Sequence, residues 1–355
     1  MRTVDQQTLG SPALSELQIR AAEAAGAAIK RWQQGGLSRR MVLGVIGSLA
    51  ALWVQGFNRS RVVNREGLLR AVRERPAGVP LISCSNHMST LDDPLMWGAR
   101  GLPRFNPANT RWVLTAEDIC FTNPVYAYFF RLGQCIPIRR GAGVHHEYVL
   151  EVLARINRGE WVHTFPEGKI QQELGPLPRL KWGIGSLIAR ASTPPIVLPV
   201  CHSGFQQMLP QKTTFLGIQS GRPKLPLVGK NVTIVVGDLL EFDVPALKKE
   251  AESAVARAKA EGKAFPWEAA VGEAESASVT RPGEGQRGIE ESITPRASNK
   301  ATASTAQATL PLMPEDNATK WLYAEISERI RVKMEELAFE AHRLNAMGRR
   351  WFMSK

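Results

Sequence analysis

The sequence predicts an α/β fold, one sheet flanked by helices, for residues 58–261 of this 355-residue chain. Short apolar segments that suit buried strands alternate with helical segments from Gly78 onward. Hydrophobic residues make up 44% of the chain, which lies in the range of globular proteins. The composition changes sharply after Trp267, and this change places the end of the domain near residue 261.

Residues 1–40 are predicted to form a helical or flexible extension. The segment 12–34 is rich in Ala, and two Gln and two Gly residues then interrupt the helical pattern. Three acidic residues, Asp5, Glu16 and Glu23, argue against a mitochondrial presequence, because such presequences are poor in acids.

Residues 41–57 are predicted to form an anchor at the membrane interface. The apolar run 41–54 lies between Arg39-Arg40 and Arg59. It is shorter than the roughly 18 to 20 apolar residues that cross a bilayer. Cations beside a short apolar segment suit a helix that lies in one leaflet and contacts lipid phosphates. The alternative is a helix of the protein core.

Within the domain, six segments are predicted strands and three are predicted helices. The strands are 78–84, 111–116, 134–138, 161–165, 196–200 and 232–236. The helices are 62–75, 148–157 and 181–190.

After the domain, residues 262–314 are predicted to be a disordered insertion, because this stretch has almost no large apolar residues with which to form a core. Residues 315–355 are predicted to hold a C-terminal helix, 317–347, that packs on the domain. Its apolar stripe is Leu322, Ile326, Ile330, Met334, Leu337 and Leu344. Contact of this stripe with a membrane or a partner is the alternative.

The charge of the chain predicts a polyanionic partner. Forty-five Lys and Arg against 33 Asp and Glu give a net charge of +12. The basic residues flank an apolar segment and are not interleaved with stacking aromatic residues, so we expect an anionic membrane surface and no nucleic acid. The four cysteines are far apart and predict neither a disulfide framework nor a zinc site.

Residues 85–94, Ser-Asn-His-Met-Ser-Thr-Leu-Asp-Asp-Pro, are the most informative segment for function. An imidazole held by a carboxylate can take a proton from an alcohol at neutral pH. Five helical positions rotate the chain by roughly 140° net, so His87 and Asp92 cannot share a face within one helix. We therefore expect His87 in a loop before a helix that starts either with a Ser89–Asp92 capping box or at Asp93-Pro94. The alternative is that Ser89 and Asp92 only cap the helix, while His87 bonds to backbone.

Three further segments carry polar residues at strand ends. Arg139 and Arg140 follow the strand 134–138 and suit phosphate binding, although they could form a solvated turn. Pro166-Glu167-Gly168 stops the strand 161–165 and presents Glu167 and Lys169 at the sheet edge, although it could be an ordinary turn. A polar loop, 201–204, follows the strand 196–200. His163 is expected to be a core histidine.

In this order, the four segments resemble the four blocks of the glycerolipid acyltransferase family, with His-x4-Asp first and Phe-Pro-Glu-Gly third. Within that family, the chain is similar to the tafazzin branch. The resemblance runs from about residue 58 to 242. It is dense in 86–94, 116–122, 133–141, 161–169 and 181–185.

The resemblance implies a mixed central sheet flanked by helices, and acyl transfer between membrane phospholipids and lysophospholipids of the cardiolipin type. It implies no metal, no cofactor and no obligatory coenzyme A. His87 would be the general base and Asp92 would orient it. Arg140, Glu167, Gly168 and Lys169 would bind the glycerophosphate of the substrate. The enzyme would face the intermembrane space from a mitochondrial membrane.

Other interpretations stay open. An acyl-CoA-dependent lysophospholipid or lysophosphatidate acyltransferase, or an N-acylphosphatidylethanolamine synthase, would use the same His/Asp pair. A membrane scaffold that has lost the chemistry is the alternative from another class. Ser89 and Cys84 are interpreted as structural, because the lipid hydroxyl attacks directly.

Overall fold

The computed structural model of this chain describes residues 36–353, except 140, 145, 212, 216–217, 221–222, 224, 264 and 266–315. The predictions for 1–35, for almost all of the insertion and for Arg140 therefore lie outside the described residues.

A seven-stranded sheet forms the centre of the domain, in the order β1-β9-β6-β2-β5-β3-β4. The strands are β1 (Arg59–Val63), β2 (Leu81–Ser85), β3 (Trp112–Ala116), β4 (Cys135–Ile138), β5 (Trp161–Thr164), β6 (Ile196–Ser203) and β9 (Asn231–Val236). All neighbours are parallel except β6 and β9, which are antiparallel. The expected mixed sheet is confirmed. A separate antiparallel pair is formed by β7 (Thr213–Phe215) and β8 (Ile218–Ser220).

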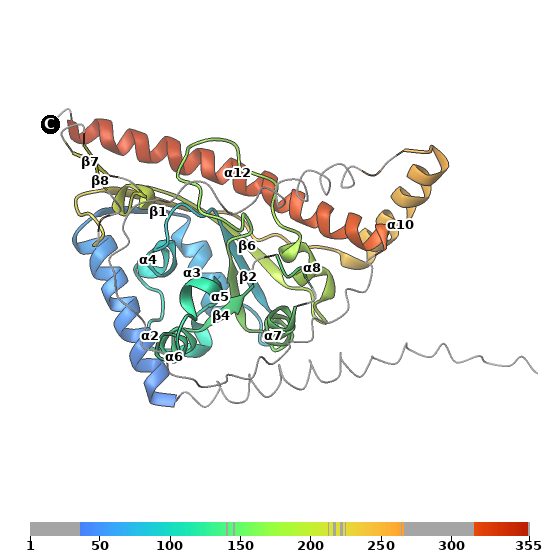
Figure 1. The fold of residues 1–355 in the computed structure, drawn as a ribbon, viewed down its shortest axis with the longest axis horizontal. Coiled ribbons are helices and arrows are strands. Elements are labelled where there is room, and N and C mark those ends of the chain that lie inside the picture. Colours follow the sequence, from blue (N-terminus) through green and yellow to red (C-terminus); the bar gives the residue numbers. More distant parts are fainter. Residues whose placement is uncertain are drawn as a thin grey trace, which may run out of the picture.

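Helices cover both faces of the sheet (Figure 1). They are α2 (Gly36–Ala51), α3 (Arg65–Arg73), α4 (Asp92–Leu95), α5 (Glu117–Cys120), α6 (Pro124–Leu132), α7 (Glu147–Ile156), α8 (Gly183–Arg190), α9 (Phe205–Met208), α10 (Val244–Ala260) and α12 (Asn317–Met353). The π-helix η1 (Leu52–Gly56) continues α2, and the 3-10 helices η2 (Met96–Gly98) and η3 (Pro107–Asn109) follow α4.

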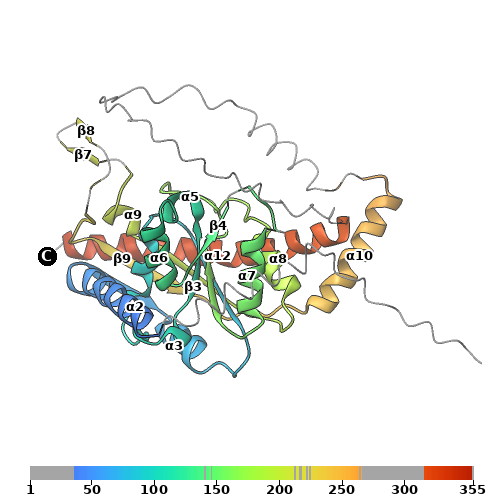
Figure 2. The same cartoon turned by 60° about the horizontal axis from the view of Figure 1, so that its bottom comes forward.

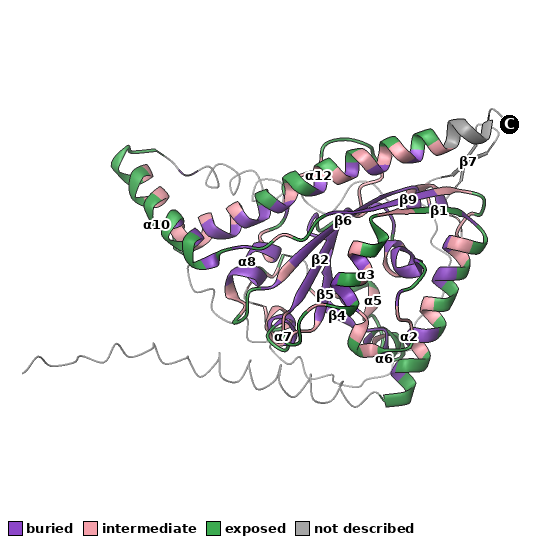
Figure 3. Cartoon of the chain, turned by 180° about the vertical axis from the view of Figure 1, so that it is seen from behind, coloured by how far each residue is buried: buried purple, intermediate pink, exposed green. Residues whose placement is uncertain are grey.

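The alternation of side chains along the strands divides the core into two clusters. In β2, Ile82 and Cys84 face the cluster that α7, α8, α10 and α12 complete, whereas Leu81 faces the cluster formed with α2, α3 and η2. The central strands β2 and β5 are buried along their length, and β6 is buried after its first residue (Figure 3). Strands that are covered on both faces have apolar residues at successive positions. Such continuous apolar runs are the pattern from which the sequence predicted these strands.

The predicted helix 62–75 is wrong at its start, because Arg59–Val63 forms β1. Both valines pair with β9, a strand that lies about 170 residues later, so no local pattern could indicate this pairing. Asn64 ends the strand with a left-handed φ of 53° and accepts a hydrogen bond from the Gly67 N–H at 3.2 Å. This N-cap starts α3 at Arg65.

The C-terminal helix packs on the domain as predicted. Ile326, Ile330 and Met334 of α12 are fully buried in the core cluster on its face of the sheet. The Cys201 thiol of β6 donates to the Met334 carbonyl at 3.1 Å. The alternative of a membrane or partner contact for this stripe is therefore wrong.

Together, α2 and η1 form one helix of 21 residues, Gly36–Gly56, with a mean hydropathy of 1.4. It is long and apolar enough to cross a membrane, so the prediction that this segment is too short is wrong. The predicted run began only at Met41, whereas the helix begins five residues earlier. A helix that packs in a soluble core can meet the same criteria, so length and composition alone are weak evidence for a span.

The two sides of this helix have different environments. Leu43, Ala50 and Val54 are buried against the domain. The opposite side carries an exposed row that we call the α2 stripe: Leu37, Met41, Val45, Leu49 and Leu52. The core-helix alternative explains only the first side, because it leaves the five exposed apolar side chains of the α2 stripe without apolar surroundings.

Candidate active site

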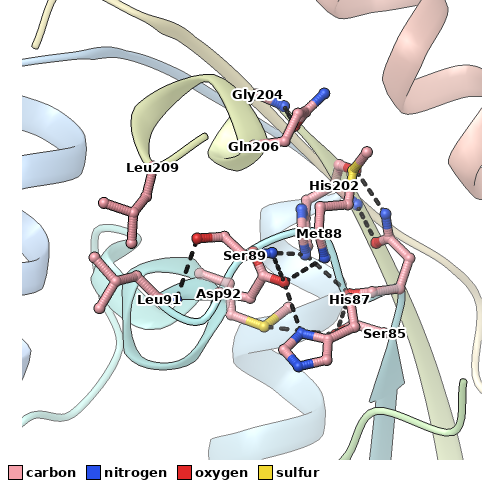
Figure 4. Close-up of polar contacts among 12 residues, drawn as sticks. Ser85, His87, Met88, Ser89, Leu91, Asp92, His202, Gly204, Gln206 and Leu209 are labelled. Atoms are coloured by element: carbon pink, nitrogen blue, oxygen red, sulfur yellow. Dashed lines mark hydrogen bonds and ion pairs between the residues drawn. The ribbon is translucent and has the colours of Figure 1, made fainter. Parts of the chain in front are cut away.

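The first polar residues after β2 build the site. His87 lies in the loop that follows the strand, as the spacing predicted. α4 begins at Asp92 with Leu91 as its N-cap, and not directly after Ser89 as the predicted capping box would place it. The His87 Nδ1 and the Asp92 Oδ2 are 3.0 Å apart (Figure 4). The sequence therefore folds so that the chain turns between the two residues and brings their side chains together.

The carboxylate of Asp92 is held by more than the imidazole. It is fully buried, and its Oδ2 also accepts hydrogen bonds from the Met88 N–H at 2.6 Å and the Ser89 N–H at 2.8 Å. The Ser89 hydroxyl accepts from the Leu91 N–H at 3.2 Å. Half of the predicted capping box thus forms, with Asp92 bonded back to Ser89 N–H.

The alternative helix start at Asp93-Pro94 is wrong. Asp93 has extended backbone angles inside the turn, with φ −95° and ψ 120°. Its carboxylate accepts from the Trp97 Nε1–H at 2.6 Å and pairs with Arg111. Although burial opposes ionisation, the Arg111 guanidinium lowers the pKa of Asp93.

The orientation of the His87 ring follows from these contacts. With Nδ1 donating to the buried carboxylate, Nε2 is the free acceptor of the neutral ring. The His87 side chain is 21% exposed, and the ring stacks on Phe165 with centroids 4.2 Å apart. The edge opposite Asp92 carries Nε2, so this edge faces the cleft that His87 lines. A base in this position can accept a proton from a substrate in the cleft.

The turn after β5 brings Glu167 to the same site. Gly168 has a left-handed φ of 74°, which favours glycine, and its N–H donates to the Phe165 carbonyl at 3.1 Å. Glu167 Oε1 accepts from the His87 N–H at 2.8 Å. Burial raises the pKa of Glu167 to about 7. The carboxyl therefore changes charge near neutral pH, next to the His/Asp pair.

One cleft of about 1530 Å³ joins these groups. His87, Glu167, Gly168 and Lys169 line it, so the structure brings together the predicted residues that it describes. Its apolar wall includes Leu114, Ile138, Val149, Val152, Ile184 and Leu187. The cleft exceeds the roughly 300–1,000 Å³ of usual small-molecule sites, and such a space suits a long hydrocarbon substrate.

The predicted arginine pair is described only in part. Arg140 lies outside the described residues. Arg139 lines the cleft and forms an ion pair with Glu117, with Nε and Oε2 3.0 Å apart.

Sequence reasoning missed His202, which lies behind the His/Asp pair. Its Nε2 is 3.6 Å from Asp92 Oδ1 and 3.1 Å from the Asn86 carbonyl oxygen. The Asn86 amide donates to the His202 carbonyl and accepts from the His202 N–H, each at 2.9 Å. Burial lowers the pKa of His202, so the neutral ring is favoured. The polar loop 201–204 was the available signal, but its distance of over 100 residues from Asp92 hid the contact.

Two cations of the cleft were also missed. Arg179 and Lys181 line it together with Lys169. The Lys181 N–H donates to the Pro166 carbonyl at 2.8 Å, which fastens this segment to the turn that carries Glu167. The signal was the basic Arg179–Lys181 pattern directly before α8.

His163 is a core histidine, as predicted. Its ring nitrogens contact the hydroxyls of Ser83 at 2.9 Å and Ser85 at 3.3 Å. Burial lowers the pKa of His163 to about 3, so the ring stays neutral.

Comparisons with known proteins find relatives of this chain. The family described as Acyltransferase matches residues 62–203. The chain is 49% identical over 218 residues to an N-acylphosphatidylethanolamine synthase of Arabidopsis thaliana, covering 61% of this chain and 75% of that protein. It is 38% identical over 224 residues to a Tafazzin of Drosophila melanogaster, covering 61% and 56% of the two chains. It is 35% identical over 213 residues to a Taffazin of Dictyostelium discoideum, covering 57% and 69%.

One solved structure is also similar. It is the crystal structure of a 1-acyl-sn-glycerophosphate (LPA) acyltransferase from Thermotoga maritima, with a TM-score of 0.38 and 17% identity, covering 70% of this chain and 93% of that chain. The match to the Drosophila protein spans just over half of the length of that relative.

Proposed function

The chain belongs to the glycerolipid acyltransferase family, and on this basis we propose that it moves an acyl chain from a phospholipid to the hydroxyl of a lysophospholipid. The observation that carries the proposal is the His87–Asp92 pair, whose free ring edge faces a large, mainly apolar cleft. The resemblance of the sequence to the tafazzin branch implies a phospholipid as the acyl donor and cardiolipin-type lipids as substrates, and relatives named Tafazzin and Taffazin match the chain.

His87 acts as the general base in this proposal. Its Nε2 takes the proton of the acceptor hydroxyl while that oxygen attacks the ester carbonyl carbon of the donor. Asp92 stabilises the imidazolium that forms. The tetrahedral intermediate then expels the glycerol oxygen of the donor, which takes the proton back from His87. The products are a new phospholipid and a new lysophospholipid.

The cations of the cleft position the lipids. Lys169, Arg179 and Lys181 supply the positive charge that the phosphates of donor and acceptor require. Glu167 holds the loop of His87 through the backbone bond and is placed to contact the acceptor. Arg140 keeps its expected role as a phosphate ligand within this proposal.

The α2 stripe supports a location on a membrane. Five large apolar side chains face away from the domain along one helix, where an aqueous environment is unfavourable. We propose that α2 and η1 anchor the enzyme to a mitochondrial membrane, where it faces the intermembrane space. The mitochondrial location rests on the resemblance of the sequence to the tafazzin branch.

A second candidate is N-acylation of phosphatidylethanolamine, which the name of the Arabidopsis relative favours. The same base would deprotonate the ethanolamine ammonium before its nitrogen attacks the ester carbonyl. An amine must lose its proton first, so this reaction would speed up with rising pH more steeply than ester formation.

An assay that crosses donors with acceptors separates these reactions. Labelled phospholipid or labelled acyl-CoA is offered to purified enzyme in vesicles that contain a lysophospholipid or phosphatidylethanolamine. We expect label from phospholipid to appear in the former lysophospholipid. Transfer from acyl-CoA alone, or labelled N-acyl lipid as the main product, would refute the first proposal.

Substitution of the base tests the mechanism. His87→Ala should lower the rate at least about 100-fold, the usual contribution of a positioned general base. The matched control is His146→Asn, because His146 caps α7 through its ring and Asn keeps the capping ability. A folded His87→Ala protein with an intact rate would disprove the role of His87.

A further inference from the structure

The segment that crosses from β3 to β4 carries an unusual density of exposed apolar side chains. It contains α5 and α6, and six of its large residues are exposed: Ile119, Val125, Tyr126, Tyr128, Phe129 and Phe130. We call this set the crossover surface. Exposed apolar residues that occur singly are normal in soluble proteins, whereas a contiguous patch marks an interaction site.

The local sequence presents these side chains on a fixed scaffold. Asn123 caps α6 by accepting from the Val125 and Tyr126 N–H groups, and Pro124 occupies the first turn. The single charged residue of α6, Arg131, points inward and pairs with buried Glu151 at 2.9 Å. The outer side of α6 therefore exposes apolar and aromatic groups without an exposed charge.

The crossover surface adjoins the α2 stripe. Helices α2 and α6 are in contact, and both views show them side by side (Figures 1 and 2). The cleft of the active site lies against both helices. Leu43 and Ile46 of α2 line it, and so do Ile119, Phe129 and Phe130 of the crossover. The apolar wall of the cleft thus continues onto the apolar outside of the molecule.

We propose that the crossover surface inserts into the same membrane leaflet as the α2 stripe, and that lipid substrates enter the cleft between α2 and α6. The occupant of this surface is a lipid bilayer. Three observations support a bilayer. The crossover surface is continuous with the α2 stripe, and it is continuous with the apolar wall of the cleft. It also carries two tyrosines, whose amphipathic rings suit the headgroup region. The inference rests on the proposed function for the identity of the cleft's substrate.

A paired substitution tests the surface. The double variant Val125→Ser/Tyr126→Ser makes the crossover surface more polar. The two residues are 61% and 55% exposed, and neither lines the cleft. The control is Val332→Ser/Phe339→Ser on α12, a helix that packs on the opposite face of the sheet. The side chains of Val332 and Phe339 are 41% and 70% exposed. Both pairs remove one Val and one aromatic residue from a helix surface. Both variants should keep the fold, as circular dichroism and thermal unfolding will show.

Flotation with vesicles of phosphatidylcholine and phosphatidylglycerol measures the outcome. We expect membrane partitioning of the α6 variant to fall by about tenfold or more, while the α12 control stays near the wild type. Equal partitioning of all three proteins would overturn the proposal. So would an α6 variant that only loses self-association in sizing experiments, because that result would assign the surface to a second copy of this chain.

Depth and kinetics complete the test. A fluorophore on Val125→Cys should be quenched by bromine in the acyl chains, whereas one on Phe339→Cys should not. Absence of quenching at position 125 would refute insertion. The α6 variant should keep its acyl-transfer rate on a dispersed short-chain lysolipid and lose acyl transfer on vesicles. Equal losses of rate on both substrates would refute a role of the surface in access from the membrane. If the wild type transfers no acyl chain to either acceptor, the proposed function fails, and flotation and quenching still decide the surface.

Discussion

Substitution of Asp92 by Asn separates two tasks of one carboxylate. Asp92 Oδ2 accepts from two backbone N–H groups and from the His87 ring. The amide oxygen of Asn can still accept from the Met88 and Ser89 N–H groups, so the turn and the fold should persist. What disappears is the negative charge that faces the ring.

The size of the effect follows from the lost charge. A hydrogen bond to a charged group contributes about 1.5–3 kcal/mol. Since a tenfold change in rate corresponds to about 1.36 kcal/mol, kcat should fall by about 10- to 150-fold. In the proposed mechanism, the His87 ring becomes positive as it takes the acceptor proton, so the loss belongs to kcat and leaves KM nearly unchanged.

Steady-state kinetics and urea unfolding of Asp92→Asn and Asp92→Ala test this reasoning. The Ala variant leaves two buried N–H groups without an acceptor and should also lose about 1–3 kcal/mol of stability for each. The Asn variant should lose rate without a comparable loss of stability. A folded Asn variant with the wild-type kcat would show that Asp92 only caps the turn, and the general-base assignment would lose its main support.

Three further predictions concern pH, packing and thiols. Burial raises the pKa of Glu167 from 4.5 to about 7, so the folded protein binds this proton more tightly than the unfolded chain does. The free energy of unfolding of the wild type, relative to that of Glu167→Gln, should therefore fall as pH rises from about 4.5 to 7 and then level off. If both proteins showed the same change in stability across this range, the raised pKa of Glu167 would be wrong. Gly185→Ala should lower the free energy of unfolding by about 1–3 kcal/mol, measured by thermal or urea unfolding, because its Cβ would lie 2.3 Å from the Tyr323 carbonyl oxygen. The control Gly183→Ala places its Cβ more than 4 Å from any atom outside its own turn of the helix and should be nearly neutral. Of the four thiols, only that of Cys120 is partly exposed, although partial burial raises its pKa. A thiol reagent should therefore modify Cys120 ahead of the other three, and reaction of a second cysteine at the same rate would show that the core opens.

The sequence was sufficient where the determinants are local. The buried strands carry their own apolar runs, and the five-residue spacing of His87 and Asp92 required a turn that the structure contains. The turn at Gly168 is also local, because its backbone angle requires glycine.

Long-range contacts were not predictable from the sequence. β1 depends on its pairing with β9, and His202 reaches Asp92 only because β6 lies next to β2. The start of α2 at Gly36 was missed because the first turn lacks the apolar density of the rest. The crossover surface has the same origin: whether the aromatic residues of α6 face a core or the exterior depends on what packs against them, which one helix cannot specify.

The position of α12 in the chain has a consequence for biosynthesis. Ile326, Ile330 and Met334 cover a sheet whose strands end at Val236, so this face stays open until α12 has been translated. α2 leaves the ribosome long before that moment. A nascent chain therefore exposes an unfinished apolar sheet face while the apolar helix α2 has already been made. Chains truncated before residue 320 should aggregate or be degraded, because nothing covers this face.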